Sequence, residues 1–230
     1  MTNILLKYLE NRYEKEKPSI KKKTPGPVIT ISREFGCPAN MCANGLADLL
    51  NKIKDINSPQ WKVVSKEILD QAAEELGLSP DKIDFVFSFE KRNAVDEILE
   101  SLSSKYYKSE RKIRSTIKDV IRSIGQQGFV IIVGRGGAAI LKDIEKSMHI
   151  RLIAPLDYRG DGVSRRHEIS KEEAKKLTLE MDRKRKQLRD DFSDTPIDNN
   201  DYDLIFNCKK LSTESIVDLM AKAANLQGVI

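Results

Sequence analysis

The chain has 230 residues, of which 40% are hydrophobic and 33% are charged, and its formal net charge is +5. This length allows one α/β domain with a substantial core but not two large domains, and the composition excludes a disordered chain. No apolar run approaches the roughly 20 residues that cross a bilayer, and the mild positive charge suits a protein that handles anionic metabolites.

Residues 1–26 are expected to form an N-terminal helix followed by a linker. Apolar side chains between Ile4 and Leu9 share one face of the predicted helix, and the linker KPSIKKKTPGP follows. Charged residues such as Lys7 and Glu10 interrupt the segment, so it is not a signal peptide. If the rest of the chain leaves the apolar face uncovered, a homodimer is the natural way to bury it.

Five short apolar runs alternate with helical patterns in the main domain, residues 27–230. The runs are VITIS, WKVV, FVIIVG, HIRLIA and YDLIFN, at 28–32, 61–64, 129–134, 149–154 and 202–207. Strands separated by helices predict right-handed crossovers and a mainly parallel sheet. The stretch 84–127 contains no strand candidate and is expected to form a helical insertion beside the sheet. The predicted fold class is therefore α/β.

Apolar residues at a period near 3.6 predict buried helix faces after the first strand and near the C-terminus. These residues are Cys42, Leu46, Leu49, Leu50 and Ile53, and then Ile216, Leu219 and Met220. Cys42 is thus expected in the core and not as a nucleophile. Trp61 is expected to pack in or beside the core, and His149 to be a structural residue of its strand.

The three cysteines of the chain are Cys37, Cys42 and Cys208. They show no CxxC spacing and have no nearby histidine pair, so neither a disulfide framework nor a zinc site is expected. No metal-binding residues are predicted. A reducing cytoplasm is the expected location.

The stretch from Val28 to Leu50, VITISREFGCPANMCANGLADLL, has the layout of a phosphate-binding loop. A strand, a glycine turn and an amphipathic helix follow one another, and backbone N–H groups at such a helix N-terminus bind anions. Pro38, however, has no N–H group, and neither Ala39 nor Asn40 supplies a cation. Taken alone, the stretch also fits a simple strand-turn-helix.

Two arginine-bearing segments favour a phosphate site. IIVGRGGAAIL places Arg135 just past the carboxyl end of the third strand, where open α/β sheets bind ligands. Ser170 and Glu173 form a capping box that starts a helix running to about residue 190. Asp182, Arg185 and Arg189 lie on one face of that helix. The alternatives are a surface arginine on a tight turn and a solvated charged helix.

SREFG, VGRGG, MDRKR and YDLIFN together resemble, in order and spacing, the cytidylate kinase-like family of P-loop nucleoside monophosphate kinases. The resemblance covers roughly residues 27–225. The opening of the family is similar to ITISREFG followed by Ser-Gly-Gly-Arg-Glu-Ile-Gly, whereas this chain continues CPANMCA. An arginine often seen near position 162 is Gly162 here.

The resemblance implies a P-loop NTPase-type five-stranded parallel sheet flanked by helices, with a helical insertion over 84–127 and a basic helical lid over 158–200. It also implies ATP as phosphoryl donor, Mg²⁺ bound through nucleotide phosphates, and a pyrimidine nucleoside monophosphate as acceptor. The departures in the loop predict impaired handling of the donor, because loss of one preorganised donor group commonly costs about 10²–10³ in rate.

The resemblance further implies roles for individual residues. The donor phosphates would be surrounded by Ser32, Arg33, Gly36, Cys37, Ala39, Asn40 and Met41. The acceptor phosphate would be held by Gly134 and Arg135 together with Arg165 or Arg166. Asp182 would orient the acceptor or the lid, and Arg183 and Arg185 would close on the transferring group.

Two other functions remain open from the sequence. A non-catalytic nucleotide-binding or sensing protein on the same fold would keep the acceptor side and lose the donor side. A nucleic-acid contact through DRKRKQLR is disfavoured, because this segment has no aromatic side chains for base stacking and is flanked by acidic residues.

Overall fold

The computed structural model describes residues 26–65, 70, 74, 110–193 and 195–230. The predicted N-terminal helix and most of the predicted insertion lie outside the described residues, so both stay predictions. The contacts divide the chain into two compact units. Residues 25–65 and 121–230 form the unit that carries the sheet. The other unit comprises residues 1–24 and 66–120, and its main described part is a helical segment, residues 110–120.

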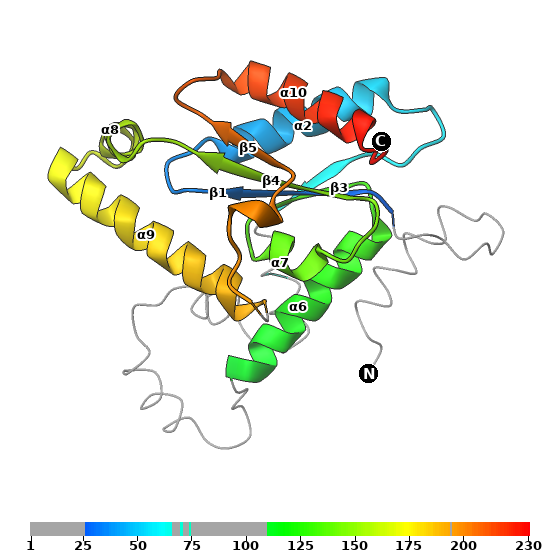
Figure 1. The fold of residues 1–230 in the computed structure, drawn as a ribbon, viewed down its shortest axis with the longest axis horizontal. Coiled ribbons are helices and arrows are strands. Elements are labelled where there is room, and N and C mark those ends of the chain that lie inside the picture. Colours follow the sequence, from blue (N-terminus) through cyan, green and yellow to red (C-terminus); the bar gives the residue numbers. More distant parts are fainter. Residues whose placement is uncertain (1–25, 66–69, 71–73, 75–109, 194) are drawn as a thin grey trace. The chain divides into compact units, whose positions relative to one another are not determined.

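The sheet has five strands, and every neighbouring pair is parallel (Figure 1). The strands are β1 (Val28–Arg33), β2 (Lys62–Val64), β3 (Val130–Val133), β4 (Ser147–Ile153) and β5 (Leu204–Asn207). Their spatial order is β2-β3-β1-β4-β5, so the first strand lies in the centre. Val28 of β1 pairs with Val130 on one side and Ser147 on the other. The predicted fold class and the parallel sheet are confirmed.

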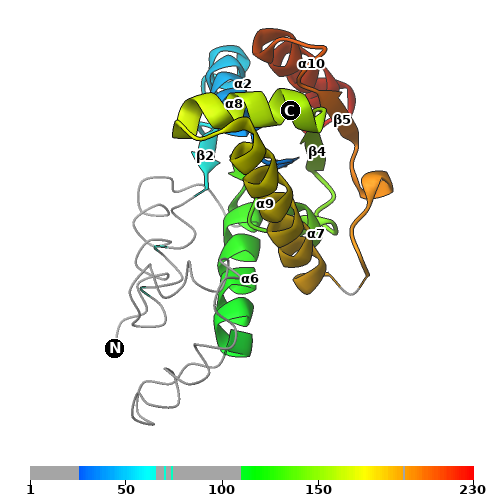
Figure 2. The ribbon, with the colours of Figure 1, turned by 90° about the vertical axis from the view of Figure 1, so that its left-hand side faces the viewer.

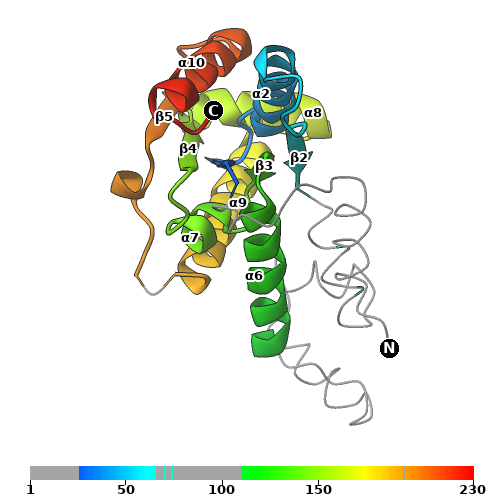
Figure 3. The same cartoon turned by 90° about the vertical axis from the view of Figure 1, so that its right-hand side faces the viewer.

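Helices cover both faces of the sheet, as Figures 1 and 3 show. On one face lie α2 (Ala39–Ile53) and α10 (Thr213–Leu226), which also pack against each other. On the other face lie α7 (Gly137–Leu141) and the C-terminal residues of α6 (Glu110–Gln127). All four residues of β3 are buried, as expected for a strand covered on both faces.

The core confirms most of the predicted helix faces. Cys42, Leu46, Leu49 and Leu50 of α2 pack in or against it, and Trp61 and Met220 are buried. The prediction of burial is wrong for two residues of these faces. Ile53 is 59% exposed because it ends α2, where the chain turns away in an extended conformation. Leu219 is 42% exposed because the buried stripe of α10 runs through Val217, Met220, Ala221 and Ala224.

Two helices follow β4 in the region predicted to form the lid. They are α8 (Leu156–His167) and α9 (Lys171–Asp191), and they pack on each other. The predicted capping box is confirmed, because the Ser170 side chain accepts from the Glu173 N–H while the Glu173 carboxylate accepts from the Ser170 N–H. A short 3₁₀ helix, η2 (Asn199–Asp201), leads into β5. Among the described helices, none combines the length and apolarity that a bilayer crossing requires.

Candidate functional site

The carboxyl ends of β1 and β3 meet a loop and the helices α8 and α9 at one edge of the sheet. Figure 2 looks onto this edge, with α8 and α9 in front. The chain leaves the central strand β1 toward β2 and β3 and returns past it to β4. In parallel α/β sheets, ligands bind at such a reversal of strand order, outside the carboxyl ends of the strands.

The loop between β1 and α2, residues 34–38, is tightly held. Gly36 has φ +92°, and a Cβ there would lie 3.1 Å from the Cβ of Arg159 and 3.2 Å from its carbonyl oxygen. Only glycine fits this position without strain. Pro38 occupies the N-cap of α2 and makes no side-chain capping bond. The predicted glycine turn between β1 and α2 is therefore present, but no side chain caps the N-terminus of α2.

Several backbone amides of the loop bind acceptors within the protein. The Phe35 N–H donates to Oδ1 of Asp182 over 2.6 Å. The Cys37 N–H donates to the Glu34 carbonyl and the Ala39 N–H to the Cys37 carbonyl, at 3.3 and 2.9 Å. Since Pro38 has no N–H, few amides of this segment are left to face an anion. A carboxylate oxygen on the Phe35 amide occupies a place that a phosphate oxygen could take.

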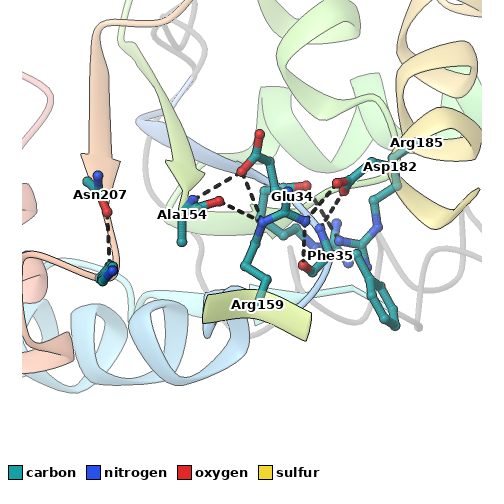
Figure 4. Close-up of polar contacts among 9 residues, drawn as sticks. Glu34, Phe35, Ala154, Arg159, Asp182, Arg185 and Asn207 are labelled. Atoms are coloured by element: carbon teal, nitrogen blue, oxygen red, sulfur yellow. Dashed lines mark hydrogen bonds and ion pairs between the residues drawn. The ribbon is translucent and has the colours of Figure 1, made fainter. Parts of the chain in front are cut away.

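A buried arginine of α8 connects the loop to α9 (Figure 4). Arg159 of α8 is 6% exposed. Its Nη1 donates to Oδ2 of Asp182 over 2.7 Å and to the Phe35 carbonyl over 3.0 Å. Its Nε lies 3.3 Å from Oε2 of Glu34 and donates to the Ala154 carbonyl over 2.8 Å. The charge of Arg159 is thus balanced by two carboxylates, as a buried guanidinium requires.

Sequence reasoning missed Arg159 and Glu34. Glu34 stands in the quoted SREFG stretch and Arg159 in the region predicted to form the lid, but nothing in the spacing indicates that they meet, because they lie 125 positions apart in the chain. A weak signal existed, since Arg159 lies among the polar residues of YRGDG directly after a buried strand.

Four arginines approach one another at the same edge and are called here the arginine cluster: Arg33, Arg135, Arg185 and Arg189. Burial, followed by repulsion from the other three arginines, lowers the pKa of Arg33 to about 9. Burial is also the largest cause that lowers the pKa of Arg185 to about 10, while Asp182 opposes the shift. Such mutual repulsion marks an excess of positive charge that an anion would relieve.

Local structure explains how these guanidinium groups come together. Arg33 ends β1, and its Nη1 lies where a Cβ on Gly134 would be, so the glycine after β3 makes room for it. Arg135 follows in the left-handed conformation, φ +55°. Arg185 donates to the Arg33 carbonyl and lies over the Phe35 ring, 5.0 Å from its centroid. Among the described residues, the Nε of Arg189 is buried without a hydrogen-bond partner.

The remaining predicted residues are placed differently. Arg165 and Arg166 are exposed in the last turn of α8, and Arg183 is exposed on α9. No described contact joins these three to the arginine cluster. In the loop, Ser32 and Ala39 are buried, Cys37 is half-buried, and Asn40 and Met41 are exposed, Met41 at 65%. Their predicted roles stay predictions.

Asp182 contacts the loop amide of Phe35 and the Arg159 guanidinium, so it connects α9 to the loop and to α8. The prediction that it orients the acceptor or the lid stays a prediction. The arginine cluster and the loop that Asp182 contacts together form an edge where an anion can bind.

The sequence matches the model of the cytidylate kinase-like family over residues 28–210. A segment of 123 residues, 52% of the chain, is 28% identical to the cytidylate kinase of Methanocaldococcus jannaschii and spans 69% of that protein. A segment of 110 residues, 47% of the chain, is 28% identical to the uronate isomerase of Corynebacterium glutamicum but spans only 21% of it.

Solved structures agree on the fold. An uncharacterized protein from Eubacterium ventriosum has a TM-score of 0.62 and 22% identity, over 89% of this chain and 99% of that one. The shikimate kinase from Bacteroides thetaiotaomicron has a TM-score of 0.51 and 11% identity, over 86% and 98%. The chain thus shares its fold with a shikimate kinase. Because the family model covers most of the sequence, the chain belongs to the cytidylate kinase-like family.

Proposed function

We propose that this protein is a nucleotide kinase that transfers the γ-phosphoryl group of ATP to a pyrimidine nucleoside monophosphate. The arginine cluster carries the proposal. Its guanidinium groups come from β1, the turn after β3 and α9, and burial together with their mutual repulsion lowers the pKa of Arg33 and of Arg185. A group of phosphates is the metabolite chemistry that best matches several convergent guanidinium groups.

The reaction requires positioning and charge neutralisation more than covalent chemistry from the protein. In phosphoryl transfer the negative charge spreads over the oxygens of the transferring group, and arginines stabilise it. Arg135 after β3 suits the acceptor phosphate, while Arg185 and Arg189 on α9 suit the transferring group. Arg33 is close enough to Arg135, Arg185 and Arg189 for their charges to lower its pKa, so it suits a shared role in charge neutralisation. Asp182 and Arg159 are positioning residues, because they hold the loop against the lid.

ATP and Mg²⁺ belong to the proposal by family membership. Among the described residues, no group of three His, Cys, Asp or Glu side chains is arranged to hold a metal ion. The nearest carboxylates of the loop region, Glu34 and Asp182, are bound to Arg159. Mg²⁺ would therefore reach this site with the nucleotide and would neutralise phosphate charge there, because Mg²⁺ commonly relies on substrate phosphates for its ligands.

The test is formation of ADP by the reduced full-length protein with ATP, Mg²⁺ and a panel of acceptors. The panel contains CMP, dCMP, UMP, AMP and GMP, with shikimate included because the fold alone is shared with shikimate kinases. Turnover is expected with a pyrimidine nucleotide and is expected to fall at least about 100-fold in Arg185→Gln. Lys52→Gln, on the exposed last turn of α2, is the matched control. No ADP formation with any nucleotide at high enzyme concentration would refute the kinase.

The occupied loop amides favour a second candidate, a non-catalytic protein that binds a nucleoside monophosphate. The Phe35 N–H is bound to Asp182, and Pro38 offers none. Calorimetry then detects CMP or a related monophosphate but not ATP. Tight, Mg²⁺-dependent binding of ATP would contradict this candidate.

A triple variant, Pro38→Gly, Ala39→Gly and Asn40→Arg, separates the two candidates. It restores an amide donor, backbone freedom and a cation at the start of α2. If the loop is a weakened donor site, ATP binds at least about tenfold more tightly, which is roughly 1.4 kcal/mol, and turnover rises. A folded variant that gains neither affinity nor turnover would show that the loop is no phosphate site.

A further inference from the structure

Phe35 belongs to the loop after β1, but its contacts come from the helices α8 and α9. The Arg185 guanidinium of α9 lies over its ring, with the central carbon 5.0 Å from the ring centroid (Figure 4). From α8, the His167 ring stacks with it at a centroid distance of 6.4 Å and an interplanar angle of 28°. The backbone is also bound, because the Phe35 N–H donates to Asp182 and its carbonyl accepts from Arg159. These contacts together hold the ring against Arg185.

Arg185 is held differently from the buried arginine of α8. Asp182 lies one turn earlier on the same helix, but its Oδ1 accepts from the Phe35 N–H and its Oδ2 from Arg159. Within the part of the chain that the structure describes, Arg185 makes one hydrogen bond, a long one of 3.4 Å to the Arg33 carbonyl, and no ion pair. Its position therefore depends mainly on the aromatic face against which it lies.

An aromatic face can orient a guanidinium without neutralising it. A guanidinium has five N–H donors in a planar fork, and a carboxylate partner commonly occupies two of them. Attraction to a ring face uses the charge of the group and leaves most of these donors for an anion. Burial lowers the pKa of Arg185 to about 10, although Asp182 opposes the shift, as expected of a charge to which no carboxylate is hydrogen-bonded.

We propose that Phe35 is a positioning residue of the anion site, whose ring holds Arg185 so that the guanidinium donors stay available for a phosphate group of the ligand. This role rests on the proposed function, because it takes the arginine cluster as the place where that phosphate binds. The Phe35 ring acts through Arg185 and does not itself bind the phosphate. The position of Arg185 on α9 is thereby tied to the loop after β1.

Two substitutions separate the aromatic face from simple packing. Phe35→Leu keeps an apolar side chain but removes the face, whereas Phe35→Tyr keeps the face. The leucine variant is expected to bind CMP at least about fivefold more weakly than the parent, and the tyrosine variant to stay within about twofold of it. Pyrophosphate has no base, and its affinity is expected to fall by a similar factor in the leucine variant, because the change acts on phosphate binding.

The contact between the ring and Arg185 is measured without any ligand, by a double-mutant cycle in thermal unfolding of the full-length protein. Phe35→Leu is expected to lower the melting temperature by about 2–4 °C more in the parent than in the Arg185→Gln background, where the contact is already lost. Phe35→Met provides a second apolar replacement if the leucine variant does not fold. Equal decreases in the two backgrounds would overturn the proposal.

Binding is measured by calorimetry with CMP and, separately, with pyrophosphate. Phe129→Leu is the matched control, because it makes the same change just before β3, where the ring packs on Trp61, and it is expected to leave both affinities unchanged.

The outcomes distinguish this role from the proposed function. Weaker binding of CMP alone by Phe35→Leu would show that the ring stacks on the base, and unchanged binding of both ligands would show that it does not position Arg185. Either result would overturn the role of Phe35 while leaving the anion site intact. A parent protein that binds neither ligand would instead refute the anion site itself, and the role of Phe35 with it.

Discussion

Replacing Asp182 with alanine is expected to destabilise the protein through the loop and not only through α9. The substitution removes the acceptor of the Phe35 N–H and one of the two carboxylates that balance Arg159. Arg159 is 6% exposed, so water does not easily replace the lost partner. A buried guanidinium that loses a partner is among the more costly defects in a folded protein.

The contacts give the size of the effect. A hydrogen bond to a charged group contributes about 1.5–3 kcal/mol, and Asp182 makes two, at 2.6 and 2.7 Å. The Asp182 side chain is 24% exposed, and Arg159 keeps Glu34 and two carbonyl acceptors. We therefore expect a loss of about 3 kcal/mol. For a chain of this length, that lowers the melting temperature by about 6–12 °C.

Thermal unfolding followed by circular dichroism measures the shift, with two further variants. Asp182→Asn keeps an acceptor for the Phe35 N–H but loses the charge next to Arg159, so its melting temperature is expected between those of the parent and the alanine variant. Asp157→Asn breaks an exposed pair with Lys175 and is expected to change little. A decrease below about 2 °C for Asp182→Ala, or one no larger than for Asp157→Asn, would refute the reasoning.

Three other changes test separate features. Gly36→Ala is expected to destabilise the protein by about 1–3 kcal/mol, because φ is +92° there and Arg159 fills the space. Gly162→Ala in α8 is expected to stabilise the protein by about 0.5–1 kcal/mol, because nothing lies within 4 Å of the new Cβ. Urea unfolding measures both changes. Burial lowers the pKa of His149, so the folded state favours the neutral ring. The free energy of unfolding should therefore fall as the pH drops below about 6.5. The substitution His149→Asn should weaken this pH dependence. Arg33→Met is expected to raise the melting temperature of the ligand-free protein and to weaken CMP binding at least about tenfold, as measured by calorimetry. CMP binding that is equal or tighter would contradict the role of the arginine cluster.

The order of strands and helices could be predicted from the sequence because each strand is a short apolar run bounded by turn residues. The runs at 129–134 and 149–154 correspond to β3 and β4 to within a few residues. The capping box at Ser170 is likewise a local pattern, and it formed as predicted. Local patterns succeed where neighbouring residues alone determine the conformation.

The site was harder to predict, because its contacts join residues that are distant in the chain. The i, i+3 and i+7 pattern correctly places Arg185 and Arg189 on one face with Asp182, and Arg33 proves to be their neighbour. The pattern does not reveal that Asp182 binds the Phe35 amide, 147 residues away. The resemblance also treats Arg183 and Arg185 alike, although of these two only Arg185 contacts the loop among the described interactions, through the Phe35 ring.

The central position of β1 has a consequence for synthesis of the chain. Val28 pairs with Val130 and Ser147, so both neighbours of the first strand are made more than about 100 residues after it. Synthesis proceeds at about 5–20 residues per second, so β1 and the apolar face of α2 leave the ribosome several seconds before the strands that pair with β1 are made. During that interval the nascent chain exposes a strand that the finished protein buries on both sides. Chaperone binding, and aggregation of fragments that stop before residue 147, are therefore expected of this topology.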